Sequence, residues 1–504
     1  MRLVYQFLIK AALILVLLTG VNNLQAQDRY GDIWVAGLSP IIAKAYLGDF
    51  PNTAILPITD SNIINRTSAC ISDANGNLQF YTNGAQVLMP DGRVMENGFG
   101  LNPDALYISI SGVSCTQGAL ILPSLENKNQ YTIFHYSIDT NVSIQNFAMY
   151  GTTKLYYTVV DMSENMGKGK VISKNNIFLS DVLLDNSRMT ACKHANGRDW
   201  WLVKTSLYKG EYYKFLYTSQ GIEGPFIQEI GDDFGPHYEG QAVFSNDGTK
   251  FATVNHIGPC VVMDFNRCTG EFSRPFTIKN LIEGQTTAYG GTSLSFSPSG
   301  RFLYINTILS LNQYDLWNSK HDSIRLFTNG DRVGDPVDPG HWLMSTSQLA
   351  PNGKIYLATW NGGIPAFHII HQPDSLGFGC QFVAFGQPVN TVNAMTLPNM
   401  PNYRLGKLVG SPCDTLVSDI KSMEVLSTGI SVYPNPAANT VSISIAENQP
   451  GLKLFVTDIN GSIVHSQAIY SETAVDISKW AAGFYFVRIE SNSKLMAMRK
   501  FVKE

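Results

Sequence analysis

The sequence predicts an all-β protein in which a β-propeller of repeated four-stranded units precedes a small C-terminal β-sandwich of immunoglobulin-like form. Three observations lead to this prediction: a composition typical of strands and turns, a repeat of about 52 residues, and a run of short strands near the C-terminus. Charged residues form only 15% of the 504 residues, against about a quarter in most globular proteins. Asn, Ser, Thr, Gly and 23 Tyr take their place, and these residues favour pleated strands and tight turns.

Residues 1–26 are predicted to be a signal peptide that is removed on export. Arg2 and Lys10 give a positive start, Ala11–Leu18 is an apolar run, and the small Ala26 offers a cleavage site. A buried first helix is the alternative, but the chain turns polar directly after Ala26. The apolar run is too short to cross a bilayer, which takes about 20 residues, and no later segment is long enough either. We therefore expect a mature chain without a transmembrane segment.

The charge of the chain excludes one class of partner. Its formal net charge is −4, and loss of Arg2 and Lys10 with the signal peptide takes it to −6. An acidic chain without a basic run lacks the electrostatic footprint that binds phosphate backbones. We therefore expect no nucleic-acid partner.

The middle of the chain repeats one pattern: a strand, a tight turn with Gly, a basic residue and a second strand. The clearest copies are residues 242–254, 294–306 and 347–359, and weaker copies are 69–82 and 191–203. The turn glycines that follow one another at intervals of 51, 52 and 53 residues are Gly197, Gly248, Gly300 and Gly353. A period near 50 residues with several strands per unit is typical of propeller blades, which bury their faces by stacking around an axis.

An irregular region precedes these copies. Gly76 and Gly197 lie 121 residues apart, which fits two units with an insertion. Residues 121–133 are the predicted degenerate copy, with its turn at residues 126–130.

The number of blades follows from the length of the region. Residues 28–410 number 383, and 383 divided by 52 gives about seven blades, with six or eight as the alternatives. We assign residues 27–410 to the propeller and expect residues 393–403 to help close the ring. A set of β-sandwich domains is the other architecture, but sandwiches lack an evenly spaced strand–turn–strand repeat. The copies between Gly240 and Thr359 resemble the repeat units of WD-like and surface-layer propellers.

Seven cysteines in an exported chain allow disulfides and leave at least one unpaired. Cys260 and Cys268 are the predicted pair, since the seven residues between them can close a hairpin between neighbouring strands. Two buried thiols on adjacent strands are the alternative. The cysteines show no paired spacing of the kind that holds structural zinc.

The C-terminal part of the chain is predicted to be a separate domain. Residues 411–428 are polar, lack a clear strand pattern and indicate a linker. Residues 429–504 contain about seven short strands, including an alternating stretch at 440–446 and a hairpin with its turn at Asn460–Gly461. Such a set of strands predicts a small β-sandwich.

This last domain resembles the type A C-terminal sorting domain of the type IX secretion system of Bacteroidetes. The residues that carry the resemblance are Tyr433, Pro434, Asn435, Pro436, Asp458, Gly461, Gly483 and Tyr485. The resemblance implies that an outer-membrane translocon and its sorting machinery recognise the domain, and that the protein passes through the periplasm to the cell surface or the medium. A carbohydrate-binding sandwich is the alternative, but the segment lacks the clustered aromatic residues that such a module needs.

The repeat alignment also places residues at one mouth of the propeller. The loops that lead into the inner strands and the loops between second and third strands meet there. Polar and aromatic side chains in these loops are expected to line a ligand pocket. The predicted ligand-binding residues are Arg66, Asn83, Lys204, His237, Glu239, His256, His341, Trp342 and Trp360.

Signals for metal or catalytic chemistry are weak. His237, Glu239, His256 and His341 can be combined into a metal site, but no short ligand spacing supports it, and hydrogen bonds to loop backbone are the favoured explanation. The segment 73–82 has part of the spacing of a calcium loop but ends in Thr82, so a tight turn explains it better. We predict no catalytic residue, no metal and no cofactor.

Two function classes follow. The favoured one is a secreted or surface-bound, non-catalytic module that recognises an extracellular protein or glycan through the mouth, because nothing catalytic stands out and propeller loops vary without cost to the core. The alternative is a secreted hydrolase or lyase acting on polysaccharide or peptide. Asp335 and Asp338 are its candidate pair of acids, but their Asp-Pro steps favour rigid turns.

Overall fold

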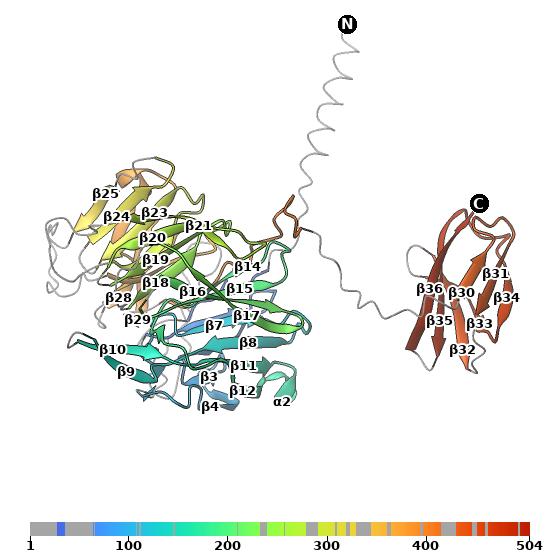
Figure 1. Ribbon diagram of the computed structural model, residues 1–504, viewed down its shortest axis with the longest axis horizontal. Helices are drawn as coiled ribbons and strands as arrows, with labels where there is room; N and C mark the ends of the chain where they lie inside the picture. Colours follow the sequence, from blue (N-terminus) through green and yellow to red (C-terminus); the bar gives the residue numbers. More distant parts are fainter. Residues whose placement is uncertain are drawn as a thin grey trace, which may run out of the picture. The chain divides into compact units, whose positions relative to one another are not determined.

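The computed structural model gives two compact units, one ending at Asp414 and one beginning at Thr415 (Figure 1). Residues described in it are 28–35, 64, 66–106, 108–109, 112–144, 147–208, 210–231, 239–256, 258–278, 291–307, 310–318, 323–328, 344–359, 364–393, 397–414, 430–445, 451–458, 462–491 and 494–504. Within these ranges the fold is nearly all β. The helical pieces there are the single turns α2 (Glu164–Gly167) and η2 (Gly377–Cys380).

The first unit is built from four-stranded antiparallel meanders, which we number as blades 1 to 6. Blade 1 holds β1 (Ala69–Ser72), β2 (Leu78–Thr82), β3 (Gln86–Leu88) and β4 (Val94–Phe99). Blade 2 holds β7 (Ala119–Pro123), β8 (Gln130–His135), β11 (Leu155–Asp161) and β12 (Lys170–Leu179). Blade 3 holds β14 (Thr190–Lys193), β15 (Trp200–Thr205), β16 (Glu211–Thr218) and β17 (Gly221–Glu229).

Blades 4 to 6 repeat the same order. Blade 4 holds β18 (Gly240–Phe244), β19 (Lys250–Asn255), β20 (Cys260–Phe265) and β21 (Phe272–Ile278). Blade 5 holds β22 (Gly291–Phe296), β23 (Phe302–Thr307), β24 (Ser310–Asp315) and β25 (Ser323–Thr328). Blade 6 holds β26 (Met344–Leu349), β27 (Ile355–Thr359), β28 (Ile364–Ile370) and β29 (Phe382–Asn393). The first strand of each blade is its inner strand. The inner strands β14, β18, β22 and β26 of successive blades lie next to one another, as do β1 and β7.

The predicted repeat is confirmed, and the described residues contain six blades, at the lower end of the expected six to eight. The degenerate copy forms β7 and β8, and the insertion is the hairpin of β9 (Thr140–Ile144) and β10 (Phe147–Thr152), which pairs with β13 (Leu184–Asp185). The estimate of about seven counted this insertion and the short hairpin of β5 (Ile108–Ser109) and β6 (Gly112–Val113) as blade. It also counted residues 397–410, which form no strand.

Close packing explains the glycine in the repeated turn. Gly248 has φ +72° and its N–H donates to the carbonyl of Ser245 at 2.8 Å. A Cβ added at Gly248 would lie 2.7 Å from the Sγ of Cys192 in the neighbouring blade. Both the left-handed conformation and the close approach therefore require glycine here.

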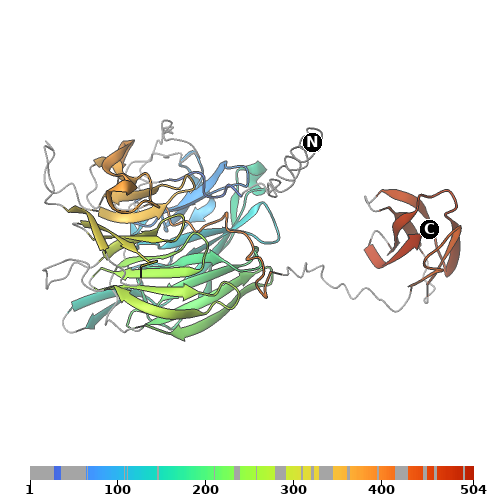
Figure 2. The same ribbon diagram turned by 90° about the horizontal axis from the view of Figure 1, so that it is seen from above.

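The ring closes where blade 6 packs against blade 1 (Figure 1 and Figure 2). Trp34, from the described segment 28–35, meets Tyr356 of blade 6 edge to face, with ring centroids 5.8 Å apart. Both rings belong to the same buried cluster as Cys70 and Ile71 of blade 1. Burial of this aromatic and aliphatic surface is the main force that holds the first and last blades together.

Side-chain amides near the axis form hydrogen bonds with backbone groups of the inner strands. The Gln117 amide donates to the carbonyl of Ala242 and accepts from its N–H, both at 2.9 Å, so blade 2 reaches blade 4. Gln241 makes the equivalent pair of hydrogen bonds with Ser347, which joins blade 4 to blade 6. Buried backbone groups require partners, and these glutamines supply them where no further strand fits.

Residues 397–414, which we call the axial segment, cross the end of the ring. Asn399 donates from Nδ2 to the carbonyls of Ala119 at 3.0 Å and Met189 at 2.9 Å, and its N–H donates to Ser68 O at 2.8 Å. One residue thereby holds blades 1, 2 and 3. The prediction that residues 393–403 help to close the ring is confirmed for 397–403, and residues 394–396 lie outside the described ranges.

A disulfide fastens the far end of the axial segment. Cys413 is bonded to Cys268, which follows β20 in blade 4, and their Cα atoms are 5.6 Å apart. The predicted pairing of Cys260 with Cys268 is wrong, because Cys260 begins the six-residue strand β20 and Cys268 lies three residues beyond its other end. Cys260 is instead a buried free thiol, as are Cys70, Cys115, Cys192 and Cys380.

The second unit is a two-layer β-sandwich. One layer has the order β30 (Ile430–Tyr433), β31 (Thr440–Ile445) and β34 (Glu472–Asp476), and the other has β33 (Ile463–Ala468), β32 (Leu452–Thr457), β35 (Gly483–Ser491) and β36 (Lys494–Lys503). The seven described strands agree with the expected number. Their shared core includes Val441, Leu454, Val487 and Phe501. The predicted turn at Asn460–Gly461 lies outside the described residues.

Candidate functional site

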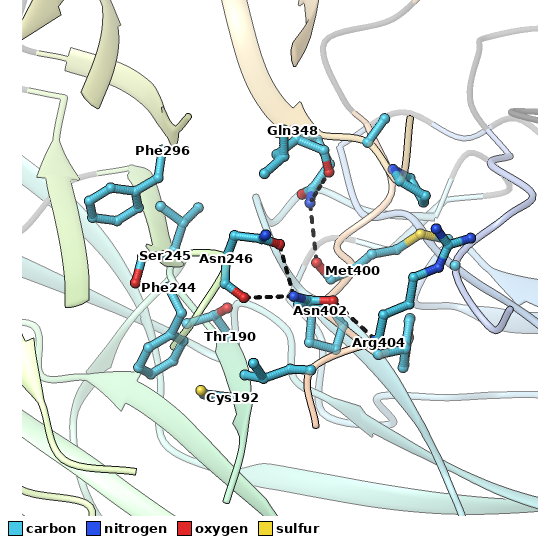
Figure 3. A pocket seen from close by; sticks show the side chains of 18 of the residues that line it. Thr190, Cys192, Phe244, Ser245, Asn246, Phe296, Gln348, Met400, Asn402 and Arg404 are labelled. Atoms are coloured by element: carbon cyan, nitrogen blue, oxygen red, sulfur yellow. Dashed lines mark hydrogen bonds between the residues drawn. The ribbon is translucent and has the colours of Figure 1, made fainter. Parts of the chain in front are cut away.

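A cavity of about 470 Å³ opens at one end of the propeller axis (Figure 3). Its wall is made by the last residues of the inner strands β14, β18, β22 and β26, the turns that follow β18, β22 and β26, and the axial segment from Asn399 to Gly406. We call it the axial cavity and its end of the ring the turn end, because the repeated turns lie there. The predicted mouth is at the opposite end of the same strands.

The repeat itself places part of the rim. Asn246, Pro298 and Pro351 occupy the same position of three successive turns, two residues before the glycine of each, and all three line the cavity. The strand residues just before these turns include Phe244, which lies close to Cys192, and Phe296, which lies farther along the same side of the cavity (Figure 3). This side is therefore apolar.

Amide groups make the opposite, polar side and hold one another in place. Asn402 donates from Nδ2 to the carbonyl of Asn246 at 2.7 Å and to its Oδ1 at 2.9 Å (Figure 3). Gln348 donates to the carbonyl of Met400 at 3.2 Å, and the N–H of Arg404 donates to the Oδ1 of Asn402 at 3.0 Å. The wall is thus fixed before any ligand arrives, which reduces the entropy that binding must overcome.

Two cationic residues, Lys193 and Arg404, are part of the cavity wall. The Lys193 ammonium donates to the carbonyl of Tyr403 at 2.9 Å and lies 5.0 Å from the ring centroid of Trp200. Burial lowers the pKa of Lys193, and the carboxylate of Asp28, 3.8 Å away, acts in the opposite direction. Arg404 is paired with Asp32 at 2.5 Å.

Cys192 contributes a neutral surface to the cavity. Burial raises the pKa of its thiol to about 12, so the thiolate is absent at neutral pH. Its Sγ lies 3.6 Å from the carbonyl oxygen of Lys193. Cys192 therefore acts here as a small apolar side chain.

The structure describes five of the nine residues predicted for the mouth, namely Arg66, Asn83, Lys204, Glu239 and His256. His237, His341, Trp342 and Trp360 lie outside the described residues. Arg66 next to blade 1 forms an ion pair with Glu239 next to blade 4, on opposite sides of the ring. The N–H of His256 donates to the carbonyl of Glu239 at 2.7 Å, and burial lowers the pKa of the imidazole.

Lys204 and Asn83 are enclosed in the scaffold of the mouth end. The Lys204 ammonium is fully buried, 2.5 Å from Oδ1 and 2.7 Å from the carbonyl of Asp185. Burial lowers the pKa of Lys204 to about 8, against the opposing effect of Asp185, which also pairs with Arg188 at 2.6 Å. Asn83 accepts hydrogen bonds from the N–H groups of Ala85 and Gln86 at 3.1 and 3.2 Å. Whether the mouth binds a ligand stays a prediction.

Sequence reasoning missed the axial cavity. Two signals for it were present: the equivalent turn positions of Asn246, Pro298 and Pro351, and a Pro- and Asn-rich stretch after the last repeat that lacks a strand pattern. The second signal identifies an irregular segment but not its partners, since these come from blades far away in the sequence.

The other chemical candidates have structural explanations where they are described. Asp73 accepts from the N–H groups of Asn75 and Asn77 at 2.9 Å, which is the tight turn favoured over a calcium loop. Among described residues, His194 with Cys268 and Cys413 has ligand atoms within 4.8 Å of one another, but the two cysteines form the disulfide.

The residues that carry the resemblance in the C-terminal domain make hydrogen bonds that hold its strand ends and turns, and one of them joins the two ends of the domain. Asn435 accepts from the N–H of Val502 at 2.9 Å, and Tyr433 donates to Glu472 at 2.6 Å. Asp458 accepts from the N–H of Ser462 at 2.9 Å, and Tyr485 donates to the carbonyl of Ala481. Pro434 and Pro436 flank Asn435, Gly483 begins β35, and Gly461 lies outside the described residues.

Comparison with protein families identifies residues 431–504 as a secretion system C-terminal sorting domain. The protein therefore carries the sorting domain of the type IX secretion system, and the secretion machinery is its partner. It is secreted to the cell surface or beyond. In the described part of the chain, no helix has the length and apolar character to cross a membrane.

No curated protein matches the chain. Solved structures resemble it loosely. A putative 6-phosphogluconolactonase from Bacteroides uniformis is 10% identical over 66% of this chain and 99% of its own, with a TM-score of 0.35. The periplasmic gluconolactonase PpgL of Pseudomonas aeruginosa is 10% identical over 73% and 98%, with a TM-score of 0.36. PorZ, a surface component of the type IX secretion system of Porphyromonas gingivalis, is 11% identical over 96% and 88%, with a TM-score of 0.23.

Proposed function

We propose that the propeller is a non-catalytic binding module which recognises an extracellular protein or glycan through the axial cavity. The observation that carries the proposal is the cavity itself, walled by four blades and the axial segment. Its volume of about 470 Å³ lies within the usual range for ligand pockets, roughly 300 to 1,000 Å³.

The chemistry of the wall supports binding of a hydroxylated or peptide ligand. Phe244 and Phe296 offer an apolar side, and Asn246, Gln348 and Asn402 offer amide groups across from it. Sugars and peptides both combine apolar faces with hydrogen-bonding groups, and such ligands suit a pocket with one side of each kind.

The proposal includes the route to the site. Residues 1–26 would direct the chain into the periplasm as a cleaved signal peptide, and the sorting domain would take it across the outer membrane. The propeller of residues 27–410 would be the part that acts outside, and the predicted linker 411–428 would separate it from the sorting domain, residues 429–504. The first residues of this linker, up to Asp414, belong to the axial segment.

The predicted mouth is the second candidate site. Arg66, Glu239 and His256 come together there from blades 1 and 4, which favours it over any other surface for a second ligand. The same residues would serve the alternative function of a hydrolase or lyase.

Binding of the full secreted chain to arrays of bacterial and host glycans and of surface proteins tests the proposal. Asn246→Trp places a large side chain in the rim of the axial cavity and should lower the affinity for the captured ligand by at least tenfold. Arg66→Ala at the mouth serves as the matched control and should leave binding unchanged. Loss of binding in Arg66→Ala alone would move the site to the mouth, and turnover of the ligand would favour the hydrolase or lyase.

A further inference from the structure

The charged residues that line the axial cavity carry one sign. Among the described residues of its wall, Lys193 and Arg404 are charged and both are cations. The chain as a whole has a formal net charge of −4. A concave site lined by charges of one sign concentrates ions of the opposite sign. The axial cavity should therefore attract anions although the protein as a whole is acidic.

The charge of Lys193 is incompletely balanced by the protein. Its side chain is only 10% exposed, while Asp28, whose carboxylate is 3.8 Å away, is 45% exposed. Water therefore screens the pair on the side of Asp28. The lowered pKa of Lys193, caused first by burial, agrees with an ammonium group that the fold alone does not fully stabilise.

Arg404 shares its carboxylate with another cation. The buried Asp32 pairs with Arg404 at 2.5 Å and with Arg29 at 2.6 Å, so these three side chains together carry a positive charge. Arg267 does not line the cavity but lies next to it, since its guanidinium donates to the carbonyls of Lys193 at 2.9 Å and His194 at 3.2 Å. Asp247 also lies near Arg267, but its carboxylate is engaged by the hydroxyl of Ser245 and the N–H of Thr249.

We propose that the group which enters the axial cavity is an anion, a carboxylate of an acidic glycan or of a peptide C-terminus, held by Lys193 and Arg404. The inference rests on the proposed binding function of the same cavity. The anion supplies the charge that Lys193 lacks, and the guanidinium of Arg404 offers planar hydrogen-bond donors that match a carboxylate. Phe244 and Phe296 contact the carbon skeleton that bears it.

The test is calorimetric titration of the full secreted chain with matched probe pairs. One pair is oligogalacturonate and its methyl ester, and the other is a short peptide with a free and with an amidated C-terminus. The acid of at least one pair should bind at least tenfold more tightly than its neutral partner. Its affinity, and not that of the neutral form, should fall as salt rises. Binding of oligogalacturonate would identify the ligand as an acidic glycan, and binding of the peptide with a free C-terminus would identify it as a peptide terminus.

Variants then locate the charge. Lys193→Gln keeps a donor for the carbonyl of Tyr403. It should lower the affinity for the acidic probe by at least tenfold and have little effect on the affinity for the neutral probe. Arg301→Gln is the matched control, since Arg301 is a cation of the turn end that is paired with Asp315 and lies outside the cavity wall. It should change neither affinity.

The opposite results overturn the inference. If the ester and the amide bind as tightly as the acids, and Asn246→Trp abolishes both, the cavity is a binding site without anion selectivity. If no acid binds, the anion proposal fails whatever the array experiment finds. If Lys193→Gln melts far below the wild type, the salt dependence and the acid-to-neutral ratio of the unmodified chain decide the question.

Discussion

The two ends of the propeller are made from the same six inner strands and differ in chemistry. At the turn end the strands finish in short, regular turns, and amides, aromatic rings and the cations Lys193 and Arg404 surround a cavity. At the mouth end the charged groups Arg66 and Glu239 pair across the ring, and Lys204 and Arg188 share the buried Asp185. The comparison shows that the repeat fixes one end of the ring, while individual loop residues define the other.

The ends also differ in what closes them. Ion pairs span the mouth end, whereas a segment outside the repeat, residues 397–414, closes the turn end with hydrogen bonds from Asn399 and Tyr403. The turn end also holds the ion pair of Arg404 and Asp32, but its closure should respond most to changes in the axial segment. The coupling of the charged groups across the mouth end should respond to salt. Four predictions follow this contrast, from the largest effect to the smallest.

Truncation should have the largest effect. A chain that stops after Asp414 keeps the axial segment and the disulfide, and we expect its propeller to melt as in the full chain. A chain that stops after residue 396 loses the partners of blades 1, 2, 3, 4 and 6 and exposes buried backbone groups, so it should fail to fold. Circular dichroism and calorimetry distinguish the two. Equal melting of both truncations would show that the axial segment is not needed for closure.

Asn399→Ala is the single change expected to cost most at the turn end. It leaves the carbonyls of Ala119 and Met189 without the amide donor, and the loss should be about 3 kcal/mol of unfolding free energy. Denaturant unfolding of the secreted chain measures it. Asn129→Ala, on an exposed turn of blade 2, is the control and should change stability by less than about 0.5 kcal/mol. A similar loss in both variants would contradict the special role of Asn399.

Lys204→Met tests the mouth end, with an expected loss of about 2 kcal/mol at pH 7 as the carbonyls of Asp185 and Ser187 lose their donor. The loss should grow with pH. The folded pKa of Lys204, about 8, lies below the value of about 10.4 expected in the unfolded chain, so between these values the unfolded state binds more protons. Lys204 therefore adds stability as pH rises from about 8 to 10.4. Unfolding of both proteins across that range measures the difference, and a constant difference would refute the assignment.

The smallest effect is expected for the ion pair of Arg66 and Glu239. Both side chains are partly exposed, 21% and 17%, so a double-mutant cycle with Arg66→Ala and Glu239→Ala should give a coupling of about 1 kcal/mol. The coupling should shrink in 1 M salt, where charges are screened within about 3 Å. A coupling that resists salt would mean that the pair is sealed from water.

Local features of this fold could be predicted from the sequence, and long-range ones could not. The turn at Gly248 is specified by its neighbours and by the need for positive φ, so the repeat located it correctly. The partners of Asn399 come from three blades, and nothing near residue 399 identifies them. The prediction of the disulfide was wrong for the same reason, since Cys413 lies 145 residues from Cys268 in the sequence. The axial cavity depends on both kinds of contact, which is why only its rim of turn residues had a sequence signal.

The disulfide also decides where tension enters the propeller. The first unit ends at Asp414, one residue after Cys413. A pull from the sorting domain therefore meets the local hydrogen bonds of Asp414 and then the covalent bond to blade 4, before it reaches the hydrogen bonds of Asn399 and Tyr403. Blade 4 then carries the load through its sheet, and Asn399 and Tyr403 remain unstrained. A pulling force on the C-terminal side during export, or proteolytic cleavage of the chain after Asp414, would therefore leave the ring and its cavity intact.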